Sequence, residues 1–258
     1  MSSNNHAVVV SPEAQGRLAI RGVAEPVPDR AEALVRVRAI SLNRGEVRRA
    51  GMAAAGWRPG WDLAGEVERA AADGSGPRVG ARVVGLLPEG AWAERVAVPT
   101  HALAELPEKV TFSQAATLPV AGLTALYALA KGGPLMGRRV LVTGATGGVG
   151  DFAVQLARLA GARVTASARR QDQAPALRAL GAHEVLVGDE IPPSPKHDIV
   201  RGRPPHGAVA SSGAASGCAW ARSSWDSTAC AASSSGCPCT SAPISRRRER
   251  QPRRRRQS

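Results

Sequence analysis

An apolar strand that leads straight into a glycine-dense turn is the feature that most constrains this fold. Residues 140–142 are an unbroken apolar run, the turn occupies residues 144–150, and a helical apolar pattern follows at Phe152, Val154, Leu156 and Leu159. Such a run is typical of a buried parallel strand. Glycine lets the backbone approach a pyrophosphate, and the free amides at a helix start face its negative charge. The segment therefore predicts a dinucleotide-binding α/β unit.

The glycine spacing departs from the full dinucleotide fingerprint at one position. The fingerprint is Gly-x-Gly-x-x-Gly, and this chain has Ala145 in place of the first glycine. A tight turn that holds no ligand is the alternative. A strand at 163–167, a helix at about 174–180 and a strand at 184–187 follow at α/β spacing and favour one half of a Rossmann sheet. The candidate cofactor-binding residues of the turn are Gly144, Gly147, Gly148, Val149 and Gly150.

The end of the second strand bears on the choice between the two nicotinamide cofactors. An acidic residue there would bind the ribose hydroxyls of NAD. This chain instead carries Arg169 and Arg170, with no acid between Gly161 and Gln171. Two guanidinium groups can hold a ribose 2′-phosphate in forked geometry, so the sequence favours NADP. The alternative is that both arginines are solvated loop residues of an arginine-rich protein.

The composition changes abruptly near residue 200. Residues 201–258 hold eleven arginines against Asp226 and Glu249, a net charge of +9 out of +13 for the whole chain. The same 58 residues contain no leucine, phenylalanine, methionine or tyrosine, and 22 of them are serine or alanine. Such a segment buries too little apolar surface to offset the entropy of ordering it. We expect a disordered basic tail.

Three explanations of this tail remain open. A basic arm would bind nucleic acid or acidic surfaces non-specifically. Its four cysteines would bind zinc, although the gaps of 12, 7 and 2 positions between Cys218, Cys230, Cys237 and Cys239 form no paired knuckles. Out-of-frame translation would account for 31 arginines against three lysines and for a break inside a Rossmann unit. We favour the frame shift, and expect no nucleic-acid binding beyond non-specific contacts of the tail.

The region before the glycine turn reads as a separate, strand-rich unit. Residues 31–108 alternate short apolar strands, at 33–37, 82–87 and 95–98, with Gly/Pro turns, as in a compact β-barrel-like domain. The apolar run at 115–130 is too short to span a bilayer and predicts a buried helix with Tyr127 in the core. The polar N-terminus lacks the pattern of a secretory signal. We expect a soluble, cytoplasmic protein with no membrane partner.

Six landmarks stand in a recognisable order along the first 150 residues. They are Ser-Leu-Asn-Arg-Gly-Glu at 41–46, Pro-Gly-Trp-Asp-Leu-Ala-Gly-Glu-Val at 59–67, Gly-Ala-Arg-Val-Val-Gly at 80–85, Gly-Ala-Trp-Ala-Glu at 90–94, Leu-Pro-Val-Ala-Gly-Leu-Thr-Ala at 118–125, and the glycine turn. With them, residues 17–200 resemble the medium-chain dehydrogenase/reductase superfamily, in its zinc-free quinone-oxidoreductase and enoyl-reductase-like branch.

The resemblance implies an α/β protein with two folded domains. A GroES-like β-barrel catalytic domain would occupy residues 1–120 and an incomplete Rossmann NADP-binding domain residues 121–200, followed by the disordered tail at 201–258. Zinc-dependent relatives need cysteine and histidine ligands in the first domain. Here Arg44 stands where a ligand cysteine is expected, and Trp61-Asp62 replaces a His-Glu pair. We therefore predict no metal in the folded part.

The implied reaction is hydride transfer from NADPH to a quinone or to an enone or enoyl double bond. By resemblance, Asn43 would lie beside the nicotinamide and the substrate, and Thr124 would contact the nicotinamide region. From the residues alone, Asn43 could equally cap a turn and Thr124 bond its own backbone. Full-length members of this superfamily commonly form homodimers.

Three departures predict impaired activity. Asp151 follows the last glycine, where its charge would repel a pyrophosphate, and Gln173 stands where relatives often carry a basic residue. The later Rossmann strands have no counterpart, which would leave an unpaired sheet edge. The competing hypothesis is a non-catalytic protein whose basic tail binds nucleic acid or acidic partners.

Overall fold

The computed structural model describes residues 5–188 and 199–201. The predictions made for the basic tail, its four cysteines and its disorder fall on residues outside this range. The described residues form an antiparallel β part and a parallel α/β part, as the sequence predicts, and each is considered by itself.

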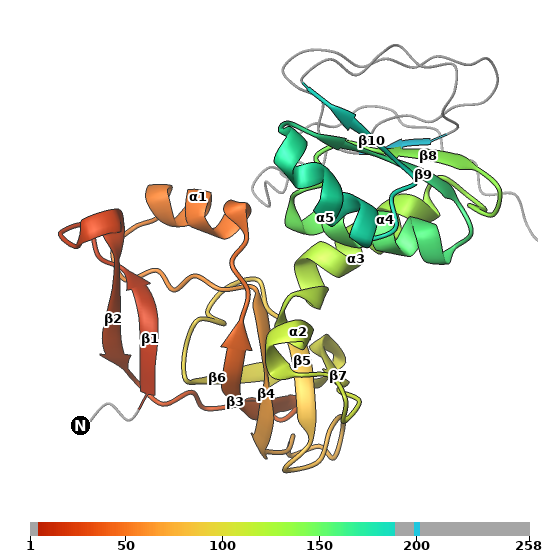
Figure 1. Ribbon diagram of the computed structural model, residues 1–258. Helices are drawn as coiled ribbons and strands as arrows, with labels where there is room; N and C mark the ends of the chain where they lie inside the picture. The colour runs from red at the N-terminus through yellow and green to blue at the C-terminus, as the bar shows by residue number, and fades with distance from the viewer. Residues whose placement is uncertain (1–4, 189–198, 202–258) are drawn as a thin grey trace, which may run out of the picture. The chain divides into compact units, whose positions relative to one another are not determined.

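An antiparallel sheet of five strands dominates the first part (Figure 1). Its order is β6-β3-β4-β5-β7, with β3 at Glu32–Ile40, β4 at Asp62–Arg69, β5 at Arg82–Leu86, β6 at Arg95–Pro99 and β7 at Leu103–Glu105. A 3-10 turn, η2 (Thr100–Ala102), joins the last two strands. Alternate side chains of these strands meet in one core, in which Val35, Leu63, Val83 and Val98 are completely buried. The three strands expected at 33–37, 82–87 and 95–98 are therefore confirmed to within a few residues.

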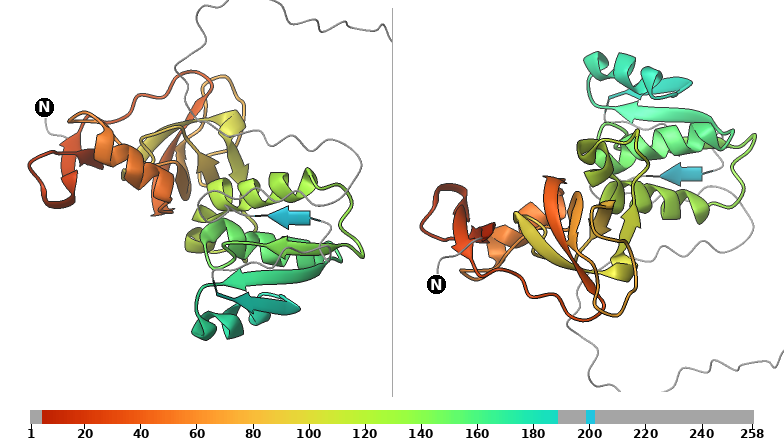
Figure 2. Two further views of the ribbon diagram at one scale, coloured as in Figure 1. Left: turned by 90° about the horizontal axis from the view of Figure 1, so that it is seen from above. Right: turned by 90° about the horizontal axis from the view of Figure 1, so that it is seen from below.

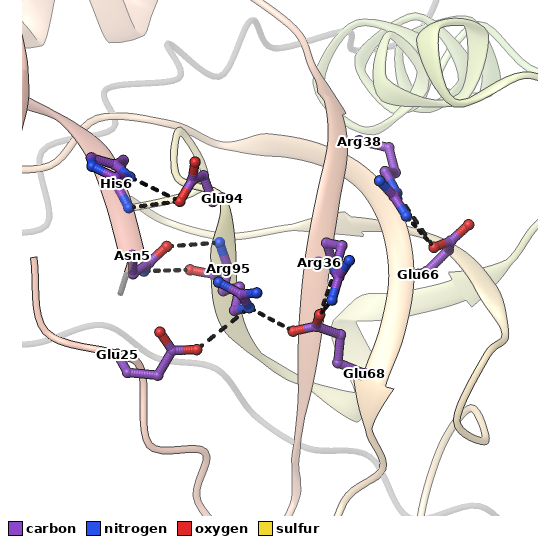
Figure 3. A network of polar contacts seen from close by, with 9 residues as sticks. All are labelled: Asn5, His6, Glu25, Arg36, Arg38, Glu66, Glu68, Glu94 and Arg95. Atoms are coloured by element: carbon purple, nitrogen blue, oxygen red, sulfur yellow. Dashed lines mark hydrogen bonds and ion pairs between the residues drawn. The ribbon is translucent and has the colours of Figure 1, made fainter. Parts of the chain in front are cut away.

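A hairpin lies beside this sheet and is tied to it by polar groups. Strands β1 (Asn5–Val10) and β2 (Leu18–Val23) pair with each other across η1 (Gln15–Arg17). Asn5 is fully buried, and its side-chain amide pairs with both the N–H and the C=O of Arg95 at 3.0 Å each. Figure 3 shows how the side chain of Arg95 continues this contact to Glu25 and Glu68. The buried amide of Asn5 and a backbone hydrogen bond from Glu94 N–H to the C=O of His6 together attach the hairpin next to β6.

The second part contains a parallel sheet in the order β10-β9-β8-β11. Its elements are β8 (Arg139–Val142), α4 (Gly148–Leu159), β9 (Arg163–Ala168), η4 (Gln171–Gln173), α5 (Ala174–Ala179), β10 (Glu184–Val187) and β11 (Ile199–Arg201). Strand β11 pairs with β8 on the side opposite β9, as both views in Figure 2 show. This is the strand order 3-2-1-4 of a Rossmann half.

The apolar run at 115–130 does not form the single buried helix that its composition predicts. It is divided among α2 (Phe112–Ala116), a π-helical turn η3 (Leu118–Gly122) and α3 (Leu123–Ala130). The buried face of α3 carries small residues such as Ala125, whereas Tyr127 is 65% exposed. The placement of Tyr127 in the core is therefore wrong, because Ala125, Ala128 and Leu129 form the buried face of α3 and Tyr127 lies outside it.

Candidate functional site

The glycine turn forms a tight connection between β8 and α4. Gly144 adopts a left-handed backbone with φ of 63°, which glycine tolerates at little cost. The N–H of Gly147 donates to the C=O of Gly144 at 3.0 Å and closes the turn. Helix α4 then begins at Gly148. The N–H groups of its first turn, from Gly148, Val149 and Gly150, have no acceptor within the helix and are available to an anion.

Gly150 brings the helix into direct contact with the strand end. A Cβ atom at this position would lie 2.6 Å from the Cα of Ala145 and would also collide with the carbonyl oxygen of Gly144. A Cβ atom at Gly148 would meet only the side chain of Ala121, at an ordinary 3.7 Å. The last glycine thus serves close helix–strand packing, which is the role of the third glycine of the fingerprint. The turn therefore fits a dinucleotide pyrophosphate despite the alanine at 145.

Arg169 and Arg170 lie at the same edge of the sheet as the glycine turn. Strands β8 and β9 are parallel neighbours, with Val142 opposite Ala166, so their carboxyl ends meet at one edge. Cofactors of this fold bind along that edge. Both arginines are exposed. The structure thus brings the predicted pyrophosphate and 2′-phosphate residues to one side of the sheet.

The two arginines differ in what they contact. Arg170 donates from Nε and Nη2 to both carboxylate oxygens of Asp172, at 3.0 and 2.9 Å. Hydrogen bonding from Arg170 lowers the pKa of Asp172. The side chain of Arg169 has no hydrogen bond or ion pair with any described residue. Arg169 is therefore the readier of the two to bind an incoming anion.

Two residues that were expected to disfavour the cofactor have local structural explanations. Gln173 accepts a hydrogen bond from the backbone N–H of Arg170 at 3.2 Å and closes η4. Asp151 lies in the first turn of α4, where a negative charge is favourable. Partial burial raises the pKa of Asp151 above its ordinary value.

Asn43 lies at the start of helix α1 (Arg44–Met52) and is bound by two carboxylates. Its side-chain nitrogen Nδ2 donates to Glu46 Oε2 at 3.0 Å and to Asp62 Oδ2 at 2.7 Å. Its backbone N–H donates to Glu46 Oε2 at 2.6 Å, which closes a capping box around the helix start. The expectation that Asn43 could cap a turn is therefore confirmed, and its suggested place beside a nicotinamide stays a prediction.

Glu46 and Asp62 are themselves fully buried. Glu46 Oε1 accepts from the N–H of Trp61 at 2.5 Å, and Asp62 Oδ1 accepts from the N–H of Val120 at 2.9 Å. Burial raises the pKa of both carboxyls, against the opposing effect of these hydrogen bonds. The cluster joins α1, β4 and η3 around Asn43. Thr124, the other candidate catalytic residue, is exposed in the first turn of α3.

Comparison with known proteins identifies the lineage. The alcohol dehydrogenase GroES-like domain family matches residues 29–108. A quinone oxidoreductase of Pongo abelii is 34% identical over 66% of this chain and 54% of its own length. The quinone oxidoreductase of Thermus thermophilus, whose structures include an NADPH complex, superimposes with a TM-score of 0.62 at 36% identity over 70% of this chain and 59% of that one. Residues 29–108 thus match the GroES-like domain family, and the chain is similar to quinone oxidoreductases of the medium-chain dehydrogenase/reductase superfamily.

The similarity extends to a quinone oxidoreductase homolog of Arabidopsis thaliana and to an enoyl reductase of known structure. A mycocerosic acid synthase-like polyketide synthase of Mycobacterium tuberculosis is 39% identical over 49% of this chain and 6% of its own length. This chain spans about half the length of the quinone oxidoreductases that it matches. Within residues 5–188 and 199–201, no helix combines the length and apolar character needed to cross a membrane.

The sequence alone assigns no role to three carboxylates that form hydrogen bonds in the structure, Glu46, Asp62 and Asp172. Glu46 follows Asn43 by three positions, and that spacing is the signal of a capping box. In the sequence, Asp62 stands out only because it replaces a residue of the expected metal site. Its hydrogen bonds with Asn43 and Val120 depend on tertiary structure. Asp172 follows directly after the acid-free segment from Gly161 to Gln171.

Proposed function

We propose that this chain is, by ancestry, an NADPH-dependent oxidoreductase that transfers hydride to a quinone or to an enone or enoyl double bond without a metal. The observation that carries the proposal is the glycine turn at the start of α4, with Gly150 packed against Ala145 and Arg169 at the same sheet edge. The similarity to quinone oxidoreductases and to an enoyl reductase supports the reaction class.

The residues present fit a dinucleotide. The amides of Gly148, Val149 and Gly150 would bind its pyrophosphate, with Gly144 and Gly147 shaping the approach. Arg169, and Arg170 once released from Asp172, would bind a 2′-phosphate. When bound, the cofactor supplies the hydride. Asn43 and Thr124 are the residues we assign to the nicotinamide and substrate.

Activity of this chain is expected to be lower than that of full-length relatives. The chain covers 54% to 62% of quinone oxidoreductases such as those of Pongo abelii and Coxiella burnetii. In the described sheet, β10 and β11 are the outermost strands, and β11 has only three residues. An incomplete sheet leaves backbone groups unpaired and gives the cofactor fewer contacts. We also propose that the GroES-like domain ends at residue 120 and the partial Rossmann domain at residue 200.

Titration with NADPH and NADH tests the cofactor site directly. We expect NADPH to bind more tightly, and Arg169→Ala to weaken NADPH binding about tenfold with little effect on NADH, because the lost guanidinium serves only the 2′-phosphate. Arg163→Ala, at the opposite end of β9, is the matched control for charge. Oxidation of NADPH by 1,4-benzoquinone measures turnover. Equal loss in both variants, or no binding of either nucleotide, would contradict the proposal.

The charge of +9 on residues 201–258 supports a second candidate, a protein whose tail binds nucleic acid. Such binding would be electrostatic, and its affinity would fall steeply with salt. Titration of the full chain with duplex DNA at 50 and 200 mM salt separates the two. Absent or salt-insensitive binding would eliminate the second candidate.

A further inference from the structure

The ion pair between Arg170 and Asp172 lies in the segment that would bind the ribose of a cofactor. Both residues follow β9. Arg170 directly precedes the η4 turn, and Asp172 lies within it. Two parallel hydrogen bonds join the guanidinium to the carboxylate, the arrangement in which arginine binds a carboxylate most specifically. The side-chain oxygen of Gln173 also accepts the backbone N–H of Arg170, which keeps the turn closed. Arg170 is therefore held by its own segment before any ligand arrives.

Arg169 provides an internal comparison. It precedes Arg170 directly, is also exposed, and forms no hydrogen bond or ion pair with a described residue. A 2′-phosphate would meet Arg169 without displacing a partner, whereas at Arg170 it would compete with Asp172 for the Nε and Nη2 donors. Two neighbouring arginines thus differ in their readiness for the same ligand group.

We propose that Asp172 is a specificity-determining residue that weakens the preference of this site for a 2′-phosphate by binding Arg170. The inference rests on the proposed function, because it concerns the ribose end of the same cofactor site. Asp172 acts in two ways. It occupies donors on Nε and Nη2 of Arg170, and its own negative charge remains close to the place where a phosphate dianion would lie.

Neither effect opposes a ribose with free hydroxyls. A carboxylate accepts hydrogen bonds from hydroxyl groups, and an acidic residue in this region is what NAD-binding sites use. The pair is exposed on both sides, with side-chain exposures of 69% and 65%, so water screens it and its contribution to stability is small. Asp172 can therefore be changed without loss of the fold, and the site would then discriminate more strongly between the two cofactors.

The test uses the full chain and two fragments of the cofactors, adenosine 2′,5′-bisphosphate and 5′-AMP, with affinities measured by calorimetry. In Asp172→Asn, which keeps the size of the side chain, we expect about fivefold tighter binding of the bisphosphate and no more than a twofold change for 5′-AMP. Asp73→Asn is the control, since it removes an exposed carboxylate in the first part of the chain and changes the net charge equally.

Arg170→Ala distinguishes release of Arg170 from simple loss of a negative charge. We expect less than a twofold effect on the bisphosphate in the wild-type background and about a fivefold loss in the Asp172→Asn background, where Arg170 is free to bind. Similar gains in Asp172→Asn and Asp73→Asn, or an equal effect of Arg170→Ala in both backgrounds, would overturn the inference while leaving the cofactor site in place. Failure of every variant to bind the bisphosphate would refute the cofactor site together with the inference.

Discussion

Gly150 is the position in the glycine turn where a single methyl group would be most damaging. Its added Cβ atom would collide with the backbone at Gly144 and Ala145, which cannot move without disturbing the end of β8. We expect Gly150→Ala to lower the free energy of unfolding by about 2 kcal/mol, in the range found for overpacked sites. Urea unfolding followed by circular dichroism measures this loss.

Gly148→Ala is the matched control for that substitution. The methyl group would meet only Ala121 at 3.7 Å, and alanine is the better helix former, so stability should be unchanged or slightly higher. Equal losses in the two variants would show that the close approach at Gly150 does not govern packing of the turn.

At the scale of elements, the buried side chain of Asn5 adds to the backbone hydrogen bonds that attach the β1–β2 hairpin. Asn5→Ala would remove both hydrogen bonds to the backbone of Arg95 and leave its N–H and C=O without these partners. We expect a loss of about 2 kcal/mol in the free energy of unfolding, because an unsatisfied buried backbone group costs on the order of 1–3 kcal/mol. Urea unfolding again provides the measurement.

The neighbouring residue supplies the comparison (Figure 3). His6 pairs with Glu94 at 3.1 Å, but both side chains are more than half exposed. His6→Ala should therefore change stability little, since solvent screens such pairs. A loss as large as that of Asn5→Ala would mean that the surface contacts, and not the buried amide, attach the hairpin.

The elements also show what local sequence does and does not determine. Alternation of apolar residues placed β3, β5 and β6, and the apolar run and glycines placed β8 and α4, because each pattern reflects burial of that element alone. The prediction for the run at 115–130 is wrong because apolar content does not reveal which face of a helix is buried. Tyr127 lies on the exposed face of α3. The partners of Asn43 are separated in sequence, so only one of them, Glu46, carried a local signal.

At the scale of the whole molecule, the carboxyl groups divide into two sets with opposite effects on stability. Hydrogen bonds and nearby cations lower the pKa of Glu13, Asp73, Glu94 and Asp172. Glu68 joins this set because the hydrogen bonds from Arg36 and Arg95 together outweigh the effect of burial. These groups favour folding when ionised, so their contribution is lost as the pH falls below their ordinary pKa values near 4.

Glu46, Asp62 and Asp151 form the second set, since burial raises the pKa of each. Above the ordinary pKa values of 4.5 for Glu46 and 3.8 for Asp62, the folded state retains protons that the unfolded chain has already lost. The free energy of unfolding attributable to these groups therefore falls as the pH rises through that window. The two sets act on opposite sides of pH 4 to 4.5 and do not mask each other.

The double variant Glu46→Gln with Asp62→Asn isolates the second set. Both substitutions keep the size of the side chain and remove the titrating group, so the decline in stability between about pH 4.5 and 8 should be shallower than in the wild type. Repulsion among the many arginines acts on both proteins, and the difference between their urea midpoints at each pH cancels most of it.

Glu66→Gln is the control: it removes a partly exposed carboxylate of β4 that pairs with Arg38, and it should keep the wild-type decline in stability. Parallel pH profiles for the double variant and the wild type would mean that the carboxylates around Asn43 are fully ionised across this range, and that hydrogen bonds from Trp61, Val120 and Asn43 offset their burial.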